Sequence, residues 1–275
     1  MELEKYEMNI KSQYGEDGVI KEIISRIGEG NKLCVEFGSW DGLHLSNTWN
    51  LWSNLGWNAI LIEGDFERFK ALERNTSHNK NVKVINEFVA IDGPNSLESI
   101  LKRSTSINEI DLLSIDIDGD DYHIFSSLKN YHARVIVIEY NPTIPPHLSI
   151  VQEPGQYFGS SALALKELAN KQGYKLAHLT ETNLFFIHQS CFQLLEIEEL
   201  NLKRAFKYEK LTTVITSFDG TEFLDKKPPF MWRLPFEKKA KGIRRFLSSR
   251  NKKHSTKPPF QSSQELIKVK IYKEE

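Results

Sequence analysis

The chain alternates short, almost wholly apolar runs with longer segments whose apolar residues recur at helical spacing. Strands that are apolar on nearly every residue are buried on both faces, which is typical of a parallel sheet covered by helices on both sides. The pattern therefore predicts a doubly wound α/β fold. The expected strands are residues 33–37, 59–62, 82–85, 111–115 and 134–138, and the expected helices are 16–27, 46–55, 66–77 and 96–102.

The pattern changes after Pro142, where a proline-rich loop leads to an expected helix over 160–171. Residues 174–188 then read as two strands around a turn at 181–183, which predicts an antiparallel pair. We therefore expect a Rossmann-like, mostly parallel sheet with an antiparallel closing strand. This core is predicted to span residues 1–190, followed by a partly irregular, basic C-terminal extension over 191–275.

Composition excludes several classes of protein. A chain of 275 residues with 40% hydrophobic content can bury a full core, which excludes a disordered or fibrous protein. Its two cysteines suit a reducing compartment. The polar N-terminus lacks the apolar stretch of a signal peptide, and no run is long enough to span a membrane, so we expect a cytoplasmic protein without a membrane span. Oligomeric state is left open.

The charge is balanced overall but not locally. Lys plus Arg number 36 against 37 Asp plus Glu, so the net charge of -1 predicts no polyanionic partner. Residues 226–257, however, hold twelve Lys or Arg, with Phe230, Trp232 and Phe236 among them. One alternative is therefore a non-enzymatic nucleotide- or nucleic-acid-binding module. A solvated tail, or a lid with its aromatics packed on the core, explains the same residues.

Acidic residues and glycines follow the first two strands. Ligands of open parallel sheets bind at the carboxyl ends of the strands, where the first strand is followed by Glu36-x-Gly38-x-x-x-Gly42. This is not the G-x-G-x-x-G pattern of dinucleotide enzymes, which argues against an NAD-binding enzyme. Glu63 ends the second strand, where an acid can accept both hydroxyls of a ribose; a helix cap or a solvated turn is the alternative. Residues 46–48 read as helix caps that could also bind a ligand carboxylate.

Taken together, these strand ends and several further motifs resemble the FkbM-type S-adenosylmethionine-dependent methyltransferases, a class I family acting on sugars and secondary metabolites. The matching motifs lie between residues 12 and 190 at 12–17, 35–38, 61–65, 113–122 and 137–142. The resemblance implies O-methylation of a sugar or other small hydroxyl-bearing acceptor rather than of nucleic acid. It also implies a cofactor site, with adenine near residues 87–89. The expected cofactor-binding residues are Gln13, Glu36, Gly38, Asp41, Gly42, Asn47, Glu63, Asp65, Phe88 and Val89.

Oxygen-bearing side chains also close the fourth and fifth strands. Asp116 and Asp118 follow one, while Glu139 and Asn141 follow the next, so neighbouring parallel strands would bring them to one crevice. Oxygen ligands favour a hard cation. By similarity to metal-dependent O-methyltransferases, Asp116, Glu139 and Asn141 are the expected ligands of Mg²⁺. The alternative is that residues 118–121 form the first turn of a helix and no metal binds.

Catalytic roles are assigned by residue type. Asp116 and Asp118 are expected to act on the acceptor hydroxyl. Histidine is a common general base, and His123 in the acidic turn and His44 beside the glycine loop are the two candidates. His132 and His147 are possible by type as well, although spacing favours none of the four.

Overall fold

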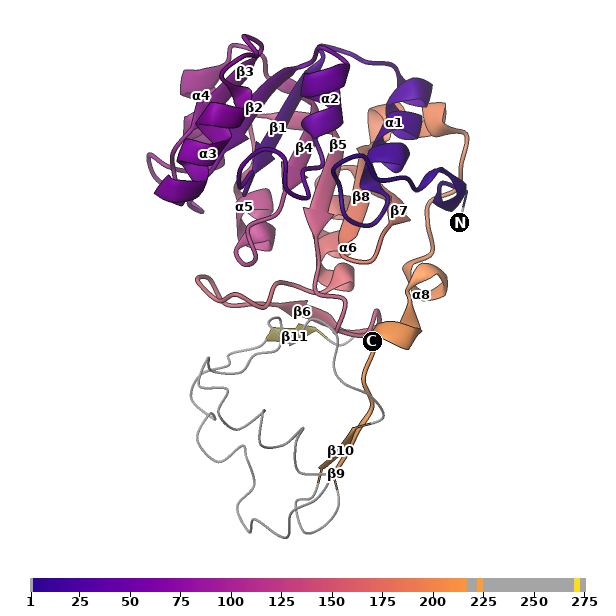
Figure 1. Cartoon of the computed structure of the whole chain (residues 1–275). Coiled ribbons are helices and arrows are strands. Elements are labelled where there is room, and N and C mark those ends of the chain that lie inside the picture. The colour runs from indigo at the N-terminus through magenta and orange to yellow at the C-terminus, as the bar shows by residue number, and fades with distance from the viewer. Residues whose placement is uncertain (1, 217–221, 225–269, 273–275) are drawn as a thin grey trace.

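Seven strands form one central sheet in the computed structural model, which describes residues 2–216, 222–224 and 270–272 (Figure 1). The strand order is β3-β2-β1-β4-β5-β8-β7, in which β1 to β5 are parallel and β8 runs antiparallel to both of its neighbours. This confirms the predicted doubly wound sheet with an antiparallel closing strand. The strands are β1 (Leu33–Phe37), β2 (Asn58–Ile62), β3 (Val82–Ile85), β4 (Glu109–Ile115), β5 (His132–Glu139), β7 (Tyr174–Leu179) and β8 (Asn183–His188).

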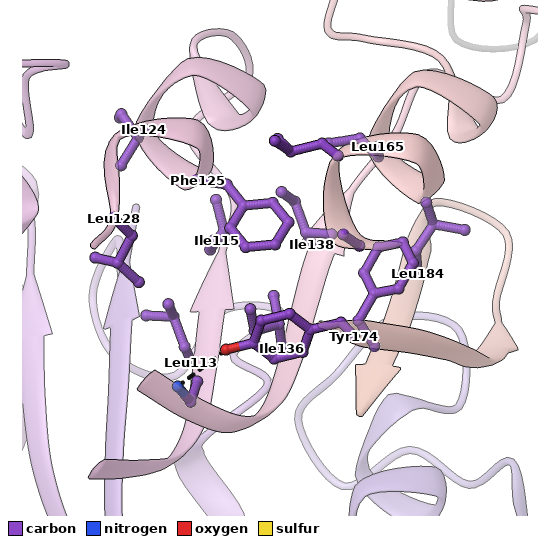
Figure 2. Packing of buried hydrophobic residues seen from close by; sticks show 14 of the residues in the cluster. Leu113, Ile115, Ile124, Phe125, Leu128, Ile136, Ile138, Leu165, Tyr174 and Leu184 are labelled. Carbon is purple, nitrogen blue, oxygen red and sulfur yellow. Dashed lines mark hydrogen bonds between the residues drawn. The ribbon is translucent and has the colours of Figure 1, made fainter. Parts of the chain in front are cut away.

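Helices cover both faces of this sheet. Neighbouring residues of β1 point to opposite faces, so Cys34 packs with α1 to α3, whereas Val35 packs with α4 to α6. Figure 2 shows the second layer, in which Phe125 and Leu165 lie over β4 and β5. The helices are α1 (Glu16–Ile27), α2 (Trp49–Asn54), α3 (Phe66–Thr76), α4 (Leu97–Ser104), α5 (Asp121–Ser127) and α6 (Ala162–Lys171).

Two helices differ locally from the sequence prediction, and the first difference has a clear cause. Helix α2 begins at Trp49 rather than near Ser46, because the Ser46 hydroxyl accepts hydrogen bonds from the backbone N–H groups of Thr48 and Trp49. Such a bond holds the chain in a turn before the helix starts. Helix α5 was expected only as an alternative explanation of the acidic turn, and it forms directly after Asp120.

The described part of the C-terminal region packs on the sheet. Phe192 and Leu195 join the hydrophobic layer of α1, and Leu202 and Phe206 join the layer of α6. The boundary expected at residue 190 stays a prediction. The remaining strands and short helices of the described chain are η1 (Glu4–Tyr6), β6 (Ser149–Val151), α7 (Gln189–Phe192), η2 (Gln193–Leu195), α8 (Leu202–Ala205), η3 (Tyr208–Lys210), β9 (Val214–Thr216), β10 (Glu222–Leu224) and β11 (Lys270–Tyr272). Among them, two further strand pairs lie outside the central sheet, β6 with β11 and β9 with β10.

The basic stretch over residues 226–257 lies outside the described residues. Within the described part of the chain, every helix is too short or too polar to cross a bilayer.

Candidate active site

The glycine loop after β1 is shaped by the end of β4. Gly38 has φ +78, a left-handed conformation that L side chains adopt at a cost. A Cβ at this position would lie 1.7 Å from the backbone oxygen of Asp116. The space beside the Gly38 Cα is thus filled by the protein's own backbone, and contact of Gly38 with a cofactor stays a prediction. Gly38 therefore brings the ends of β1 and β4 together.

Glu36 is a buried anchor beneath this loop. Its side chain is 5% exposed, and its carboxylate accepts hydrogen bonds from the hydroxyls of Ser46 (2.7 Å) and Thr48 (2.8 Å) and from the backbone N–H of Asn47 (2.8 Å). Burial raises the pKa of Glu36, although these three donors oppose the rise. The Asn47 amide in turn donates to the Ser114 hydroxyl at 3.1 Å. Both side chains thus hold the start of α2 against β1 and β4, and their contact with a cofactor stays a prediction.

Glu63 joins the end of β2 to the glycine loop. One carboxylate oxygen accepts from the backbone N–H of Trp40 at 2.8 Å, and the other accepts from that of Asp65 at 2.8 Å. Each carboxylate oxygen has two lone pairs, so the group retains capacity for further donors. The Asp65 side chain caps α3 by accepting from the N–H groups of Glu67 and Arg68, and its contact with a cofactor stays a prediction.

The remaining loop residues form a tight turn. Asp41 accepts from the backbone N–H groups of Leu43 and His44, which is the hydrogen bonding of an Asx turn. Gly42 has φ +77 and lies against the Leu72 side chain. The exposed His44 ring lies 5.1 Å from the ring of Trp40. His44 therefore sits on the outer side of the loop.

An exposed aromatic ring lies beside Glu63. Phe88 follows β3 and is 73% exposed, an unusual position for so large an apolar side chain. Its ring lies against Gly64, where a Cβ would approach within 2.2 Å of the ring. Val89 packs instead against the hydrophobic layer of α4. The structure thus places a flat apolar surface beside the residue that follows Glu63.

Three carboxylates converge at the ends of β4 and β5. One oxygen from each of Asp116, Asp118 and Glu139 lies within 4.8 Å of the others. Burial and then repulsion from Glu139 hold the pKa of Asp116 well above its ordinary value. Like charges so close favour a shared proton or a bound cation. Asp118 reaches the group from a left-handed backbone conformation, with φ +57.

Asn141 is hydrogen-bonded to the loop after β5, and its contact with a metal stays a prediction. Its amide nitrogen donates to the backbone oxygen of Phe158 at 2.7 Å, and its amide oxygen accepts from the backbone N–H and the hydroxyl of Thr143. The side chain therefore holds the loop after β5. The expected ligands Asp116 and Glu139 are brought together, but the third carboxylate of the group is Asp118.

The His123 ring is hydrogen-bonded to the loop that contains Gln152. Its Nε2 lies 2.7 Å from the backbone oxygen of Gln152, and because a carbonyl only accepts, this nitrogen carries the proton. The same loop is held by Asp120, which accepts from the backbone N–H of Gly155. Gln152 is buried and bonds to Gly159, and no spacing in the sequence marked it.

Tyr14 is a further residue at the site that the sequence does not mark. It lies in the 12–17 motif of the family resemblance, in which Gln13 is the residue expected to contact the cofactor. The Gln13 amide donates to the Tyr14 hydroxyl at 3.1 Å. Burial raises the pKa of Tyr14, and the charges of Glu181, Glu16 and Glu139 raise it further. The phenol is therefore within the field of Glu139, the carboxylate that ends β5.

One family model matches part of the chain. Residues 59–176 match the sequence model described as the methyltransferase FkbM domain, and no significant match is found among curated proteins. The matched segment contains Glu63, Phe88, Asp116, Asp118 and Glu139.

Among solved structures, the chain is similar to the N-terminal domain of EvdMO1 determined with SAH and D-fucose. The two are 12% identical, the match covers 62% of this chain and 80% of that one, and the TM-score is 0.41. It is also similar to a SAM dependent methyltransferase from Aquifex aeolicus, at 11% identity over 67% of this chain and 95% of that one, with a TM-score of 0.40. The match of residues 59–176 to the FkbM domain supports an S-adenosylmethionine-dependent methyltransferase.

Proposed function

We propose that this enzyme methylates a hydroxyl group of a sugar or another small hydroxyl-bearing metabolite. The observation that carries the proposal is the carboxyl pair of Asp116 and Glu139 at the ends of neighbouring strands. The pair lies beside the glycine loop, because Gly38 is in contact with the backbone of Asp116. A methyl donor bound along the loop would therefore have proton-accepting groups beside it.

The residues around the glycine loop fit S-adenosylmethionine. Glu63 would accept hydrogen bonds from the ribose hydroxyls, and Phe88 would offer a face for adenine. The turn from Gly38 to Gly42 would hold the methionine end. Once bound, the cofactor supplies an electrophilic methyl group on a positively charged sulfur. The buried hydrogen bonds of Glu36 keep this loop and the start of α2 in place.

The carboxyl pair would receive the acceptor's proton. As its oxygen is methylated, the acceptor hydroxyl would have to lose its proton, and one of the two carboxylates would accept it. Two adjacent carboxylates share a proton more readily than one isolated carboxylate binds it, because both burial and repulsion oppose full ionisation. A base with a raised pKa takes a proton more strongly near neutral pH. Asp116 and Glu139 thereby replace His123 and His44 as our candidates for the base.

A divalent cation is the second way to compensate this charge. Asp116, Asp118 and Glu139 provide the oxygen ligands that Mg²⁺ prefers. An ion held there would lower the pKa of an acceptor hydroxyl. We keep Mg²⁺ as a proposal, with Asp118 in the place expected for Asn141. EDTA should then abolish turnover, added Mg²⁺ should restore it, and cofactor affinity should change little. Full turnover in EDTA would leave the carboxyl pair as the base.

Calorimetry and an acceptor screen test the function. S-adenosylhomocysteine should bind the purified protein with micromolar affinity. Labelled S-adenosylmethionine should then transfer its methyl group to one member of a panel of monosaccharides, methyl glycosides and catechols, including D-fucose. Binding without transfer to any hydroxyl, combined with transfer to an amine or a thiol, would contradict O-methylation.

A further inference from the structure

The segment before α1, residues 8–17, is a closed loop with its own hydrogen bonds. The carboxylate of Asp17 accepts from three consecutive backbone N–H groups, those of residues 10, 11 and 12, at 2.7 to 2.8 Å. Met8 is bonded to Gly15 and Gly18 through their backbones. The segment lies outside the part of the chain matched by the family model. It is nonetheless built to hold one shape.

Glu16 fastens this loop to the sheet. Its side chain is fully buried, and one oxygen accepts from the backbone N–H groups of Tyr14 (2.7 Å) and Gln13 (3.2 Å). The other oxygen accepts from the hydroxyl of Thr180 (2.6 Å) and the amide of Asn183 (3.2 Å). A single carboxylate therefore connects the loop to the turn between β7 and β8, and Figure 1 shows the loop beside β8.

This connection places Tyr14 on the acceptor side of the site. Asn183 is the residue paired directly with Glu139 between β8 and β5. Tyr14 is thus separated from Glu139 by one anchoring residue and one strand pairing, and Glu139 is among the charges that raise its pKa. The phenol keeps its proton at neutral pH and remains a donor. The carboxylate group of Asp116, Asp118 and Glu139 offers only acceptors when ionised.

We propose that Tyr14, with Gln13, binds the methyl acceptor by donating hydrogen bonds to it, and that Glu16 is the positioning residue that holds them there. This inference rests on the proposed function and sharpens its substrate class. Carboxylates accept hydrogen bonds from a polyol, and Tyr14 and Gln13 donate to its oxygens. A neutral, hydroxyl-rich acceptor such as a monosaccharide can use both the acceptors and the donors, whereas the carboxylates would repel a phosphorylated sugar.

Steady-state kinetics of Tyr14→Phe provide the first test. Loss of one hydrogen bond should raise the KM for the best acceptor of the panel roughly five- to tenfold. The affinity for S-adenosylhomocysteine should stay within about twofold of the wild type, since a bond to the acceptor does not contribute to it. Tyr208→Phe is the matched control, because this half-exposed tyrosine packs on Phe206. A tenfold loss of S-adenosylhomocysteine affinity with an unchanged acceptor KM would overturn the proposal by assigning Tyr14 to the cofactor.

A second test does not depend on turnover. Tyrosines are replaced biosynthetically by 3-fluorotyrosine, and the ¹⁹F resonance of residue 14 is assigned by its loss in Tyr14→Phe. Glu139→Gln should lower the pH at which this resonance titrates, and a saturating monosaccharide should shift it in the presence of S-adenosylhomocysteine. If the resonance titrates at the same pH in Glu139→Gln as in the wild type, the placement of Tyr14 is overturned. If the resonance responds to Glu139→Gln and to the sugar but no hydroxyl is methylated, only the proposed reaction fails.

Discussion

The carboxylates at the ends of β1 and β2 have surroundings opposite to those at the ends of β4 and β5. At the ends of β1 and β2, Glu36 and Glu63 are surrounded by hydroxyl and N–H donors of the protein itself. At the ends of β4 and β5, Asp116 and Glu139 face each other. Carboxylates that are surrounded by donors organise a loop, whereas two neighbouring carboxylates can share a proton or hold a cation. The ends of β1 and β2 are therefore suited to holding a cofactor and those of β4 and β5 to acting on an acceptor.

The largest effect should come from removing one member of the carboxyl pair. Asp116→Asn should lower kcat by roughly a hundredfold or more, the usual contribution of a positioned acid or base. Affinity for S-adenosylhomocysteine should change little. Asp92→Asn is the control, since Asp92 is exposed in the loop after β3. Rapid-quench turnover and calorimetry measure the two quantities, and a variant with unimpaired kcat would remove Asp116 from the chemistry.

The same variant should be more stable than the wild type. The pKa of Asp116 is raised in the native state, so that state binds more protons than the unfolded chain once the pH exceeds about 4. The stability of the wild type therefore falls as the pH rises towards the native pKa, by about 1.4 kcal/mol for each unit of difference. In EDTA, Asp116→Asn should raise the Tm at pH 7 and lose this advantage below about pH 4. Mg²⁺ that raises only the wild-type Tm would point to a bound ion.

Substitution of Gly38 tests the contact between the loop after β1 and the end of β4. Gly38→Ala places a Cβ 1.7 Å from the Asp116 backbone oxygen in a left-handed conformation, so the loop or β4 must move. We expect a loss of roughly 3 kcal/mol of stability, together with weaker cofactor binding. Gly56→Ala is matched in conformation, with φ +71, and meets nothing within 4 Å, so it should lose only about 1 kcal/mol. Equal losses in chemical denaturation would show that the contact with β4 is unimportant.

Glu63 and Asp65 separate cofactor binding from helix capping. Glu63→Ala should weaken S-adenosylhomocysteine binding roughly ten- to a hundredfold, the effect of about 1.5 to 3 kcal/mol. Asp65→Ala should instead lose about 1 kcal/mol of stability with the cap of α3, while affinity stays nearly unchanged. Calorimetry and thermal unfolding measure both variants. If affinity falls equally in both, Glu63 acts through the shape of the loop and not through the ribose.

The fold was largely predictable because its signal is local. Each parallel strand is an apolar run in sequence, and every predicted strand lies within two residues of an observed one at both ends. The acids that follow these strands had to meet at one edge, because parallel strands all end on the same side. This is why Glu63, Asp116 and Glu139 could be expected at the site from the sequence, and why Phe88 could be expected near it from the family resemblance.

The sequence by itself therefore determined the sheet, the edge that carries the site and most of the acids on it. Only the tertiary structure decided what each polar group contacts. The Asn141 amide bonds to Phe158, 17 residues away, in the loop after β5. Tyr14 is positioned through Glu16, which bonds to Asn183, 167 residues away, on the strand β8 that pairs with β5. Such contacts leave no periodicity in the sequence. A hydrogen bond between distant segments constrains only the two residues that form it, and the residues around them show no pattern that would predict it.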